Sequence, residues 1–307
     1  MKFIQKLEKI VEKNESLLCV GLDSDFEKIS PKFTDQFEFN KAIIDATHDL
    51  VCSYKLNIAF YEAIGYKGIF SLKKTCDYLR KKYPEIPIII DAKRADIGNT
   101  NLAYVRLIFE YLNADAVTVN PYLGEESLAP FLAKKDKGII VLCKTSNSGA
   151  DEFQDLVLSS KYQVASIKGR IKLYQYVAYQ VVKKWNKNKN CLLVVGATYP
   201  SELKELRKMV GDDFWILVPG VGAQGGDLQE TLKAGLNSKK QGLIINISRA
   251  IIFSSNPKKE AERWRSEIGK VLSRKQQVLS ISYYFNSYIR IYTENNFFKF
   301  FLLFYFY

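Results

Sequence analysis

Residues 86–100 read IPIIIDAKRADIGNT, and this segment decides the fold. A continuous apolar run, IPIII, leads directly into charged residues that begin at Asp91, and a helical pattern follows from residue 102. Strands of parallel sheets are buried on both faces and therefore read as unbroken hydrophobic runs. The segment thus predicts one strand–helix unit of a parallel α/β fold.

The same unit recurs along the chain, with apolar runs bounded by turn or charge signals and followed by helical periodicity. The predicted strands cover residues 17–23, 51–57, 86–93, 116–122, 138–145, 191–198, 214–222 and 242–249. The predicted helices between them include residues 37–50, 71–82, 102–112, 163–185, 201–209 and 227–234. Eight such units close naturally into a (β/α)8 TIM barrel, a single α/β domain over residues 1–272. A doubly wound open sheet is the alternative, but no G-x-G-x-x-G follows the first strand.

Composition narrows the class of protein. The hydrophobic share of 47% argues against a disordered or fibrous chain. The net charge of +12 fits an anionic partner, whether nucleic acid, membrane or a phosphorylated metabolite, but a basic surface by itself more often serves only solubility. The five cysteines form no C-x-x-C and there is one histidine, so no disulfide framework, zinc knuckle or His-rich metal site is expected. Cysteines in apolar runs indicate buried thiols in a reducing, cytoplasmic compartment. The first residues predict an amphipathic helix, not a signal peptide.

Residues 273–307 differ from the rest of the chain, with 13 of its 41 aromatic residues in 35 positions. The final apolar stretch, 297–307, is shorter than the roughly 20 residues that span a bilayer. Phe, Tyr, Asn, Ile and Lys dominate translations of AT-rich noncoding sequence, so we interpret this aromatic-rich tail as a gene-model artefact. An interfacial anchor or a dimer arm is the alternative.

Polar residues collect where the predicted strands end, which is where barrels of this kind carry their active sites. Asp91 and Lys93 are two positions apart and should project to one side of their strand, and Lys55 on the neighbouring strand should reach the same space. Charges that point into a barrel mouth are costly unless they are paired or functional. The other polar residues at these ends are Asp23, Asn57, Thr145, Ser146, Ser248 and Arg249.

A phosphate site is predicted after the seventh and eighth strands, where barrels commonly bind phosphate. Residues 218–227 read VPGVGAQGGD and lead into a helix. Glycines there allow backbone N–H groups to approach an anion at the helix N-terminus, and Gln224 is a side-chain donor. Arg249, just after the eighth strand, offers a guanidinium fork that fits phosphate oxygens.

Together these features resemble the orotidine 5′-phosphate decarboxylase family, in particular its longer bacterial and protozoan branch. The segment 91–100 resembles the family's D-x-K-x-x-D-I signature, and the likeness continues through residues 120–124, 145–149 and 220–226, in the expected order. The resemblance extends over residues 1–272. It implies conversion of orotidine 5′-phosphate to uridine 5′-phosphate, the last step of pyrimidine synthesis, without a metal or an organic cofactor.

The resemblance implies a catalytic tetrad of Lys55, Asp91, Lys93 and Asp96 in a homodimer, with Asp96 contributed by the partner subunit. Lys93 would donate the proton to C6 of the pyrimidine as carbon dioxide leaves, and Asp91 would lie beside the substrate carboxylate. Opposite charges a few ångströms apart hold one another ionised, which agrees with these roles. A cation where carbanion character develops would stabilise mainly the transition state.

The resemblance also implies the substrate contacts. Lys55 and Asp23 would hold ribose hydroxyls, with Asn57 lining the same pocket, and Ile97 and Thr100 would join Asp96 from the second subunit. Thr145 and Ser146 would read the pyrimidine ring, with Pro219 packed beside it, and Gln224, Gly226 and Arg249 would bind the 5′-phosphate. The loops 145–156 and 220–226 are expected to close over the substrate.

Two other functions compete with this one. Magnesium-dependent decarboxylases and aldolases of the same barrel superfamily share a D-x-K-x-x-D-like segment but carry a metal-binding Glu near the end of strand 2, where this chain has Lys55. A basic barrel that binds RNA or a membrane surface is the other, but no basic–aromatic motif marks a nucleic-acid site in the barrel. We therefore expect neither a nucleic-acid nor a membrane partner. The preceding orotate phosphoribosyltransferase activity is expected on a separate polypeptide, a candidate physical partner.

Overall fold

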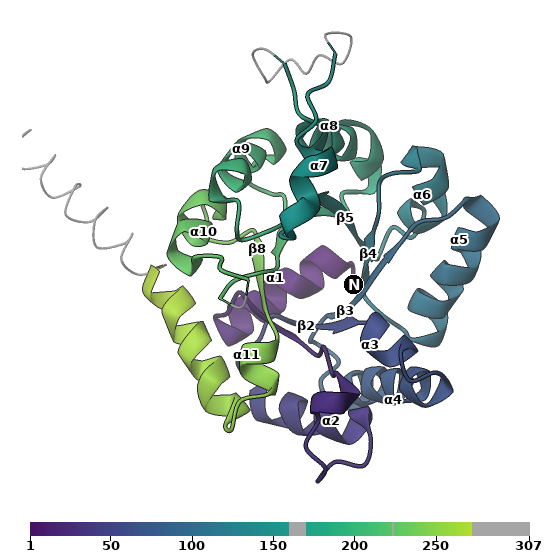
Figure 1. The fold of residues 1–307 in the computed structure, drawn as a ribbon, viewed down its shortest axis with the longest axis vertical. Helices are drawn as coiled ribbons and strands as arrows, with labels where there is room; N and C mark the ends of the chain where they lie inside the picture. Colours follow the sequence, from purple (N-terminus) through teal and green to yellow (C-terminus); the bar gives the residue numbers. More distant parts are fainter. Residues whose placement is uncertain (160–169, 223, 272–307) are drawn as a thin grey trace, which may run out of the picture. The chain divides into compact units, whose positions relative to one another are not determined.

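The computed structural model describes residues 1–159, 170–222 and 224–271. Within these residues, eight parallel strands form a closed barrel in the order β1-β2-β3-β4-β5-β6-β7-β8, and helices surround it (Figure 1). Each strand pairs with its neighbours in sequence, and β8 closes the barrel on β1. The predicted (β/α)8 barrel is confirmed.

All predicted strands form, and each is shorter than the segment predicted for it. The strands are β1 (Leu18–Gly21), β2 (Ser53–Asn57), β3 (Ile88–Arg94), β4 (Ala116–Val119), β5 (Gly138–Lys144), β6 (Cys191–Val195), β7 (Ile216–Val218) and β8 (Leu243–Ile247). The side chains of β1, β4, β6, β7 and β8 are buried throughout, because the barrel interior and the helices cover both faces.

The helices follow the predicted pattern with adjusted ends. They are α1 (Phe3–Asn14), α2 (Gln36–Thr47), α3 (Ala59–Glu62), α4 (Tyr66–Lys82), α5 (Gly98–Val105), α6 (Gly124–Leu132), α7 (Asp151–Gln154), α8 (Leu173–Gln180), α9 (Pro200–Val210), α10 (Leu228–Gly235) and α11 (Arg249–Ile252). Residues 257–271 are also helical. The helix predicted at 163–185 begins at Leu173, since Lys172 pairs with Val157 in a β-bridge and caps the helix; residues 163–169 lie outside the described residues.

Two strands carry irregularities at their C-terminal ends. Between β3 and β4 the register moves from Ile90↔Val117 to Arg94↔Val119, so four steps along β3 oppose two along β4. Between β5 and β6 it moves from Leu142↔Val194 to Lys144↔Val195. Bulges of this kind re-aim side chains and are common at barrel rims next to active sites.

The helix α1 closes the N-terminal end of the barrel and appears at the centre of the ring in Figure 1. Phe3 and Leu7 on its apolar face are buried. Gly138 opens β5 directly against Phe3, where an added Cβ would come within 2.4 Å of the ring. Lys6 forms an ion pair of 3.0 Å with Asp115, the residue before β4. Because α1 covers the N-terminal end of the barrel, the C-terminal end is the accessible one.

Contacts divide the chain into two units, Met1–Ile268 and Gly269–Tyr307. The first unit contains the barrel. The tail for which the sequence predicts a gene-model artefact, 273–307, lies outside the described residues. Among the residues that the structure describes, no helix is both long enough and apolar enough to cross a membrane.

Candidate active site

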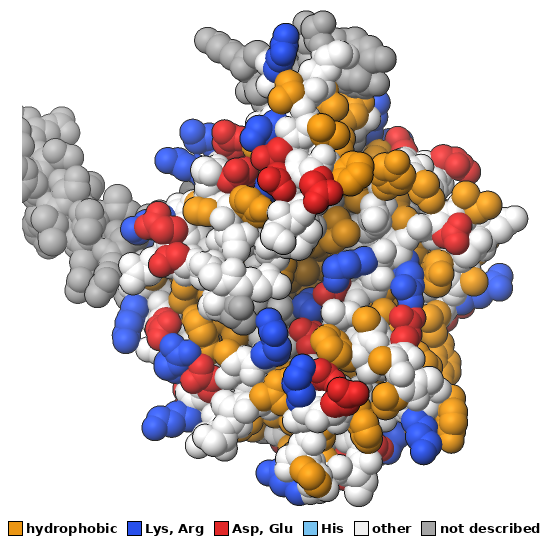
Figure 2. Space-filling view, in the orientation of Figure 1, with side chains coloured by type: hydrophobic (Ala, Val, Ile, Leu, Met, Phe, Trp, Pro, Cys, Tyr) orange, Lys and Arg blue, Asp and Glu red, His pale blue; other side chains and the backbone are white. Residues whose placement is uncertain are grey.

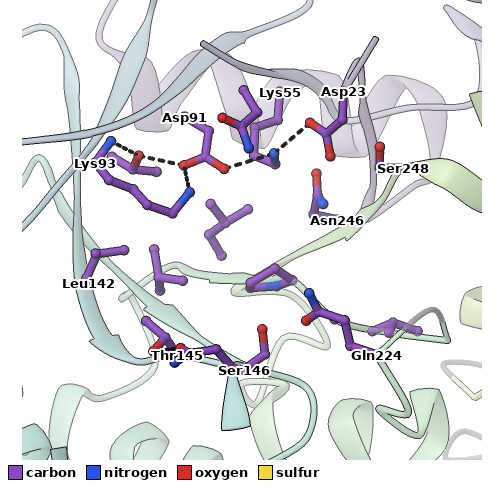
Figure 3. Close-up of a pocket in the computed structure, with 18 of the residues that line it drawn as sticks. Asp23, Lys55, Asp91, Lys93, Leu142, Thr145, Ser146, Gln224, Asn246 and Ser248 are labelled. Atoms are coloured by element: carbon purple, nitrogen blue, oxygen red, sulfur yellow. Dashed lines mark hydrogen bonds and ion pairs between the residues drawn. The ribbon is translucent and has the colours of Figure 1, made fainter. Parts of the chain in front are cut away.

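A pocket of about 430 Å³ opens at the C-terminal ends of the strands, where the sequence predicts the site. In Figure 3, Lys93, Asp91, Lys55 and Asp23 form a row on one wall, while Thr145, Ser146 and Gln224 face them across the space. The lining comprises Asp23, Lys55, Asn57, Asp91, Lys93, Thr118, Leu142, Thr145, Ser146, Asn147, Gln154, Val194, Leu217, Pro219, Gly220, Val221, Gln224, Asn246, Ser248 and Arg249. Ten of the predicted site residues are in this set.

One carboxylate lies between two ammonium groups on the charged wall. Asp91 accepts hydrogen bonds from Lys93 Nζ at 2.7 Å on Oδ1 and from Lys55 Nζ at 3.0 Å on Oδ2. Lys55 Nζ also lies 3.4 Å from Asp23 Oδ1. The predicted proximity of Lys55, Asp91 and Lys93 is therefore observed, with Asp23 as a fourth charged member of the row.

Burial and charge act in opposite directions on this row. Burial would raise the pKa of Asp91, but the positive charges of Lys55 and Lys93 hold that pKa well below its usual range. Burial would lower the pKa of Lys55, which is only 3% exposed, but the carboxylates of Asp23 and Asp91 raise it above its ordinary value. Asp91 and Lys55 therefore keep each other ionised at neutral pH.

The bulge in β3 sets the backbone conformation of Lys93. The Lys93 backbone has a φ of 48°, in the left-handed region that non-glycine residues seldom adopt. Its N–H donates to Thr118 Oγ1 at 2.9 Å, and that hydroxyl donates to Asp91 Oδ1 at 2.8 Å. Simple alternation along the strand correctly predicts that Lys93 and Asp91 share a side, but the hydrogen bonds of the bulge set the geometry. Such strain occurs mainly where surrounding structure enforces it, often at active sites.

Further polar groups at the C-terminal ends of β2 and β8 line the pocket. Asn57 Oδ1 accepts a hydrogen bond from the Ala59 N–H at 3.3 Å, which ties the side chain to the start of α3. Asn246 on β8 is buried, and its Oδ1 accepts from Cys19 Sγ at 3.6 Å. Ser248 Oγ donates to the Gly21 carbonyl at 2.9 Å. Amide and hydroxyl groups are thus available beside Asp23 for hydroxyl-bearing ligands.

The opposite wall is a polar loop that begins directly after β5. Gln154 accepts from the Thr145 N–H on Oε1 at 2.9 Å and donates from Nε2 to Thr145 Oγ1 at 2.7 Å. Thr145 Oγ1 in turn donates to Asn147 Oδ1 at 2.6 Å. Thr145 is therefore held from both sides, and Ser146 follows it into the pocket.

The glycine loop after β7 has the predicted tight conformation, but some of its backbone N–H groups donate within the loop. Gly220, Gly222 and Gly225 have φ values of 94°, 71° and 83°, as a tight anion loop requires. The N–H groups of Gly222 and Gly226, however, donate to the carbonyls of Gly226 and Gly220 within the loop, at 3.0 and 3.2 Å. The side chains of Gln224 and Arg249 line the pocket.

Four predicted site residues, Asp96, Ile97, Thr100 and Gly226, do not line this pocket in the part of the chain that the structure describes. The backbone of Asp96 is held by buried Asn101, whose Oδ1 accepts from the Asp96 N–H at 2.9 Å. Asp96 Oδ1 accepts from the Ile97 N–H at 2.6 Å. Gly226 packs against Ala197, where a Cβ would come within 2.5 Å.

Several pocket residues are not predicted from the sequence. Thr118 and Asn246 are interior polar residues of strands that otherwise read as apolar runs, so a polar residue within such a run was the available signal. Gln154 lies nine positions after Thr145, and nothing in the local sequence indicates that it returns to the same wall. Ser248 stands beside Arg249 at a predicted strand end, but the sequence assigns it no role in the site.

Comparison with known proteins agrees with this geometry. Residues 16–264 match the model of the Orotidine 5'-phosphate decarboxylase / HUMPS family. The orotidine 5'-phosphate decarboxylase of Cellvibrio japonicus is 49% identical over 284 residues, 91% of this chain and 98% of that protein. That of Flavobacterium johnsoniae is 46% identical over 279 residues, 90% and 97% of the two chains. The solved structure of Leishmania donovani OMP decarboxylase superposes with a TM-score of 0.76 at 36% identity, with 88% and 99% covered.

The resemblance drawn from the motifs is thereby confirmed. Both the sequence match and the barrel extend over the charged row and the loops that face it. The chain belongs to the orotidine 5′-phosphate decarboxylase / HUMPS family of enzymes.

Proposed function

We propose that the chain decarboxylates orotidine 5′-phosphate to uridine 5′-phosphate in this pocket. The observation that carries the proposal is the placement of Asp91 between the ammonium groups of Lys55 and Lys93, at 3.0 and 2.7 Å. The charged row faces a wall of polar loop residues and an arginine suited to a phosphate. The relatives in Cellvibrio and Flavobacterium bear the name of this activity.

Lys93 is the proton donor in the proposed reaction. As the bond from C6 to the carboxylate breaks, its electron pair stays on C6 and carbon dioxide leaves. A proton from Lys93 Nζ forms the new C6–H bond, and the neutral amine regains a proton from water. The Lys93 side chain is 49% exposed, so its ammonium group is open to the pocket while it contacts Asp91. A fixed cation beside a developing carbanion stabilises the transition state more than the ground state.

The remaining predicted residues bind the substrate. Lys55 and Asp23 hold the ribose hydroxyls beside Asn57, and Thr145 and Ser146 recognise the pyrimidine ring with Pro219 packed against it. Gln224 and Arg249 bind the 5′-phosphate. Gly226 belongs to the same phosphate loop, and its N–H donates to a carbonyl within that loop. Because the phosphate contacts are remote from C6, their binding energy can serve to close the site around the reacting carbon.

We further propose a homodimer with shared active sites, to which Asp96, Ile97 and Thr100 contribute from the partner subunit. Asp96 does not line the pocket of its own chain, and Ile97 beside it is 66% exposed. Figure 2 shows hydrophobic side chains gathered on the face toward the viewer, between the positions of α7 and α6 in Figure 1. Tyr122 (84% exposed) and Leu123 directly precede α6, and exposed Phe153 lies in α7. Tyr122 and Phe153 line the same groove. Contiguous apolar surface of this kind is typical of protein–protein interfaces.

The site is proposed to act without a metal or an organic cofactor, because the Lys55 ammonium occupies the space beside Asp91 where the metal-dependent branch carries a carboxylate ligand. The test is the loss of orotidylate absorbance on addition of the purified, folded chain in EDTA, with Lys93→Met as a matched control that keeps side-chain length. We expect turnover by the wild type and none by the control. No turnover by folded wild type would overturn the proposal, and activity that EDTA abolishes and Mg²⁺ restores would favour the metal-dependent branch.

We also propose a cytoplasmic location and a separate phosphoribosyltransferase. The five cysteines are all buried as free thiols, which supports a reducing compartment. A chain that consumes orotidine 5′-phosphate requires a phosphoribosyltransferase reaction to supply it, and we propose that another polypeptide carries that activity.

A further inference from the structure

Another buried lysine lies behind the wall that faces the charged row. Lys144, the last residue of β5, has a fully buried side chain (0% exposed). Its Nζ forms an ion pair of 2.6 Å with Asp155 Oδ1 and lies 4.3 Å from the centre of the Tyr199 ring. The other oxygen of Asp155 is 3.2 Å from Lys172 Nζ. The proposed reaction does not use Lys144 as a reacting group.

The bulge in β5 keeps this ammonium group out of the pocket. Leu142 lines the pocket, and in a regular strand Lys144, two positions later, would point to the same side. The register shift between Leu142 and Lys144 turns the lysine outward instead, beneath Tyr174 of α8 and Tyr199. Thr145, the next residue, then faces the pocket. The orientation of Lys144 and that of Thr145 are therefore linked through the backbone.

The ion pair also reaches Thr145 by a second route. Asp155 directly follows Gln154, the residue whose amide holds both the N–H and the hydroxyl of Thr145. Lys144 thus holds the far end of the loop that begins at Thr145, and Gln154 ties that end back to its start. The loop predicted to close over the substrate is anchored at residue 155 to the body of the barrel.

We propose that Lys144 and Asp155 are positioning residues that hold Gln154, and through it Thr145, in the geometry that recognises the pyrimidine ring. The proposal rests on the proposed function for the identity of the ring. Lys144 is fully buried and Asp155 is 28% exposed. An ion pair with a buried member is weak evidence for stability, because apolar side chains of similar volume often stabilise a protein as well or better. What the pair supplies at this place is a fixed position and direction for the residue next to Gln154.

The test uses Lys144→Met and Asp155→Asn, which preserve size and remove the ion pair, with calorimetric titration of uridine 5′-phosphate and of ribose 5-phosphate. Both variants should bind uridine 5′-phosphate about tenfold more weakly, the effect of misplacing one or two hydrogen bonds. Binding of ribose 5-phosphate, which has no pyrimidine ring, should stay within about twofold of wild type. Thermal unfolding confirms that each variant is folded.

A double-mutant cycle separates positioning from general loosening. Gln154→Ala should weaken uridine 5′-phosphate binding, and adding Asp155→Asn to it should weaken binding no further, because both act through one group. Lys6→Met is the matched control, since it removes another buried Lys–Asp pair, Lys6–Asp115, at the opposite end of the barrel. This control should bind both ligands as the wild type does.

Three results would overturn the inference: unchanged uridine 5′-phosphate binding by Lys144→Met and Asp155→Asn, an equal loss for ribose 5-phosphate, or additive effects with Gln154→Ala. Failure of the proposed function looks different, because the wild type itself would then not bind uridine 5′-phosphate. The titration needs no turnover, so the two outcomes are distinguishable.

Discussion

Lys55→Met tests whether the charged row depends on its buried lysine. Lys55 is 3% exposed and contacts Asp91 at 3.0 Å and Asp23 at 3.4 Å. Methionine fills a similar volume but cannot donate, so the substitution leaves two carboxylates without their shared cation. Asp91 retains Lys93 at 2.7 Å and Thr118 at 2.8 Å. Asp91 should therefore lose only part of the contacts that stabilise its carboxylate, and Asp23 should lose a larger share.

Removing one partner from a buried ion pair costs about 3–5 kcal/mol, and the contacts that Asp91 retains favour the lower end of that range. In a domain of this size, a loss of about 3 kcal/mol should lower Tm by about 6–12 °C. Turnover should fall by about a hundredfold or more, the usual effect of removing a preorganised group that holds the reacting centre.

The stability lost in Lys55→Met should depend on pH in a direction that follows from the two pKa shifts. The depressed pKa of Asp91 contributes stability that is present above its unfolded value of about 3.9 and is lost as the pH falls through the folded value. The raised pKa of Lys55 contributes stability that is fully present below its unfolded value of about 10.4. The difference in unfolding free energy between wild type and Lys55→Met should thus be constant from about pH 5 to 9 and shrink below about pH 4.

Urea unfolding at several pH values measures this difference, and orotidylate turnover measures the activity. Lys6→Met is a suitable control, because Asp115 keeps Arg80 at 2.6 Å after Lys6 is removed. Burial lowers the pKa of Lys6 despite the charge of Asp115, so its ionised form gains less from folding than that of Lys55. The control should lose less stability and retain turnover. A Lys55→Met protein as stable as wild type at pH 7, or a stability difference that grows in acid, would refute this reasoning.

Further predictions concern the reacting group, the phosphate, the dimer and the tail. Lys93→Ala should still bind uridine 5′-phosphate by calorimetry but turn over at less than a tenth of the wild-type rate, a loss above about 1.4 kcal/mol; a faster rate would show that Lys93 is not the proton donor. Arg249→Ala should instead raise the Kd for uridine 5′-phosphate, and unchanged affinity would remove Arg249 from the phosphate site. Homodimers of Lys93→Ala and of Asp96→Ala should be nearly inactive, and subunit exchange should restore about a quarter of wild-type activity, since half the dimers then carry one intact site. Verified exchange without recovery would exclude a shared site. Removal of residues 273–307 should leave thermal unfolding and turnover largely unchanged, because the eight strands and every proposed site residue precede them; insoluble or inactive protein would contradict this.

The sequence by itself was sufficient to predict the barrel and most of its site. A strand that is buried on both faces needs consecutive apolar residues, as in residues 86–90 and 191–195. This requirement is local, so the sequence alone reveals such strands. Their number and alternation with helical segments predict the eight strands that the structure contains. Polar residues at the ends of those runs, including Asp91 and Lys93, then mark the mouth of the barrel.

The tertiary structure decided what depends on contacts between distant segments. The bulges in β3 and β5 arise from pairing with β4 and β6. The first gives Lys93 its left-handed backbone conformation, and the second turns Lys144 away from the pocket. Gln154 meets Thr145 only because the loop after β5 folds back on itself. A strand's periodicity specifies which side a residue takes only while the register is regular. Where the register shifts, the neighbouring strand determines the side chain's direction, and no pattern within one segment contains that information.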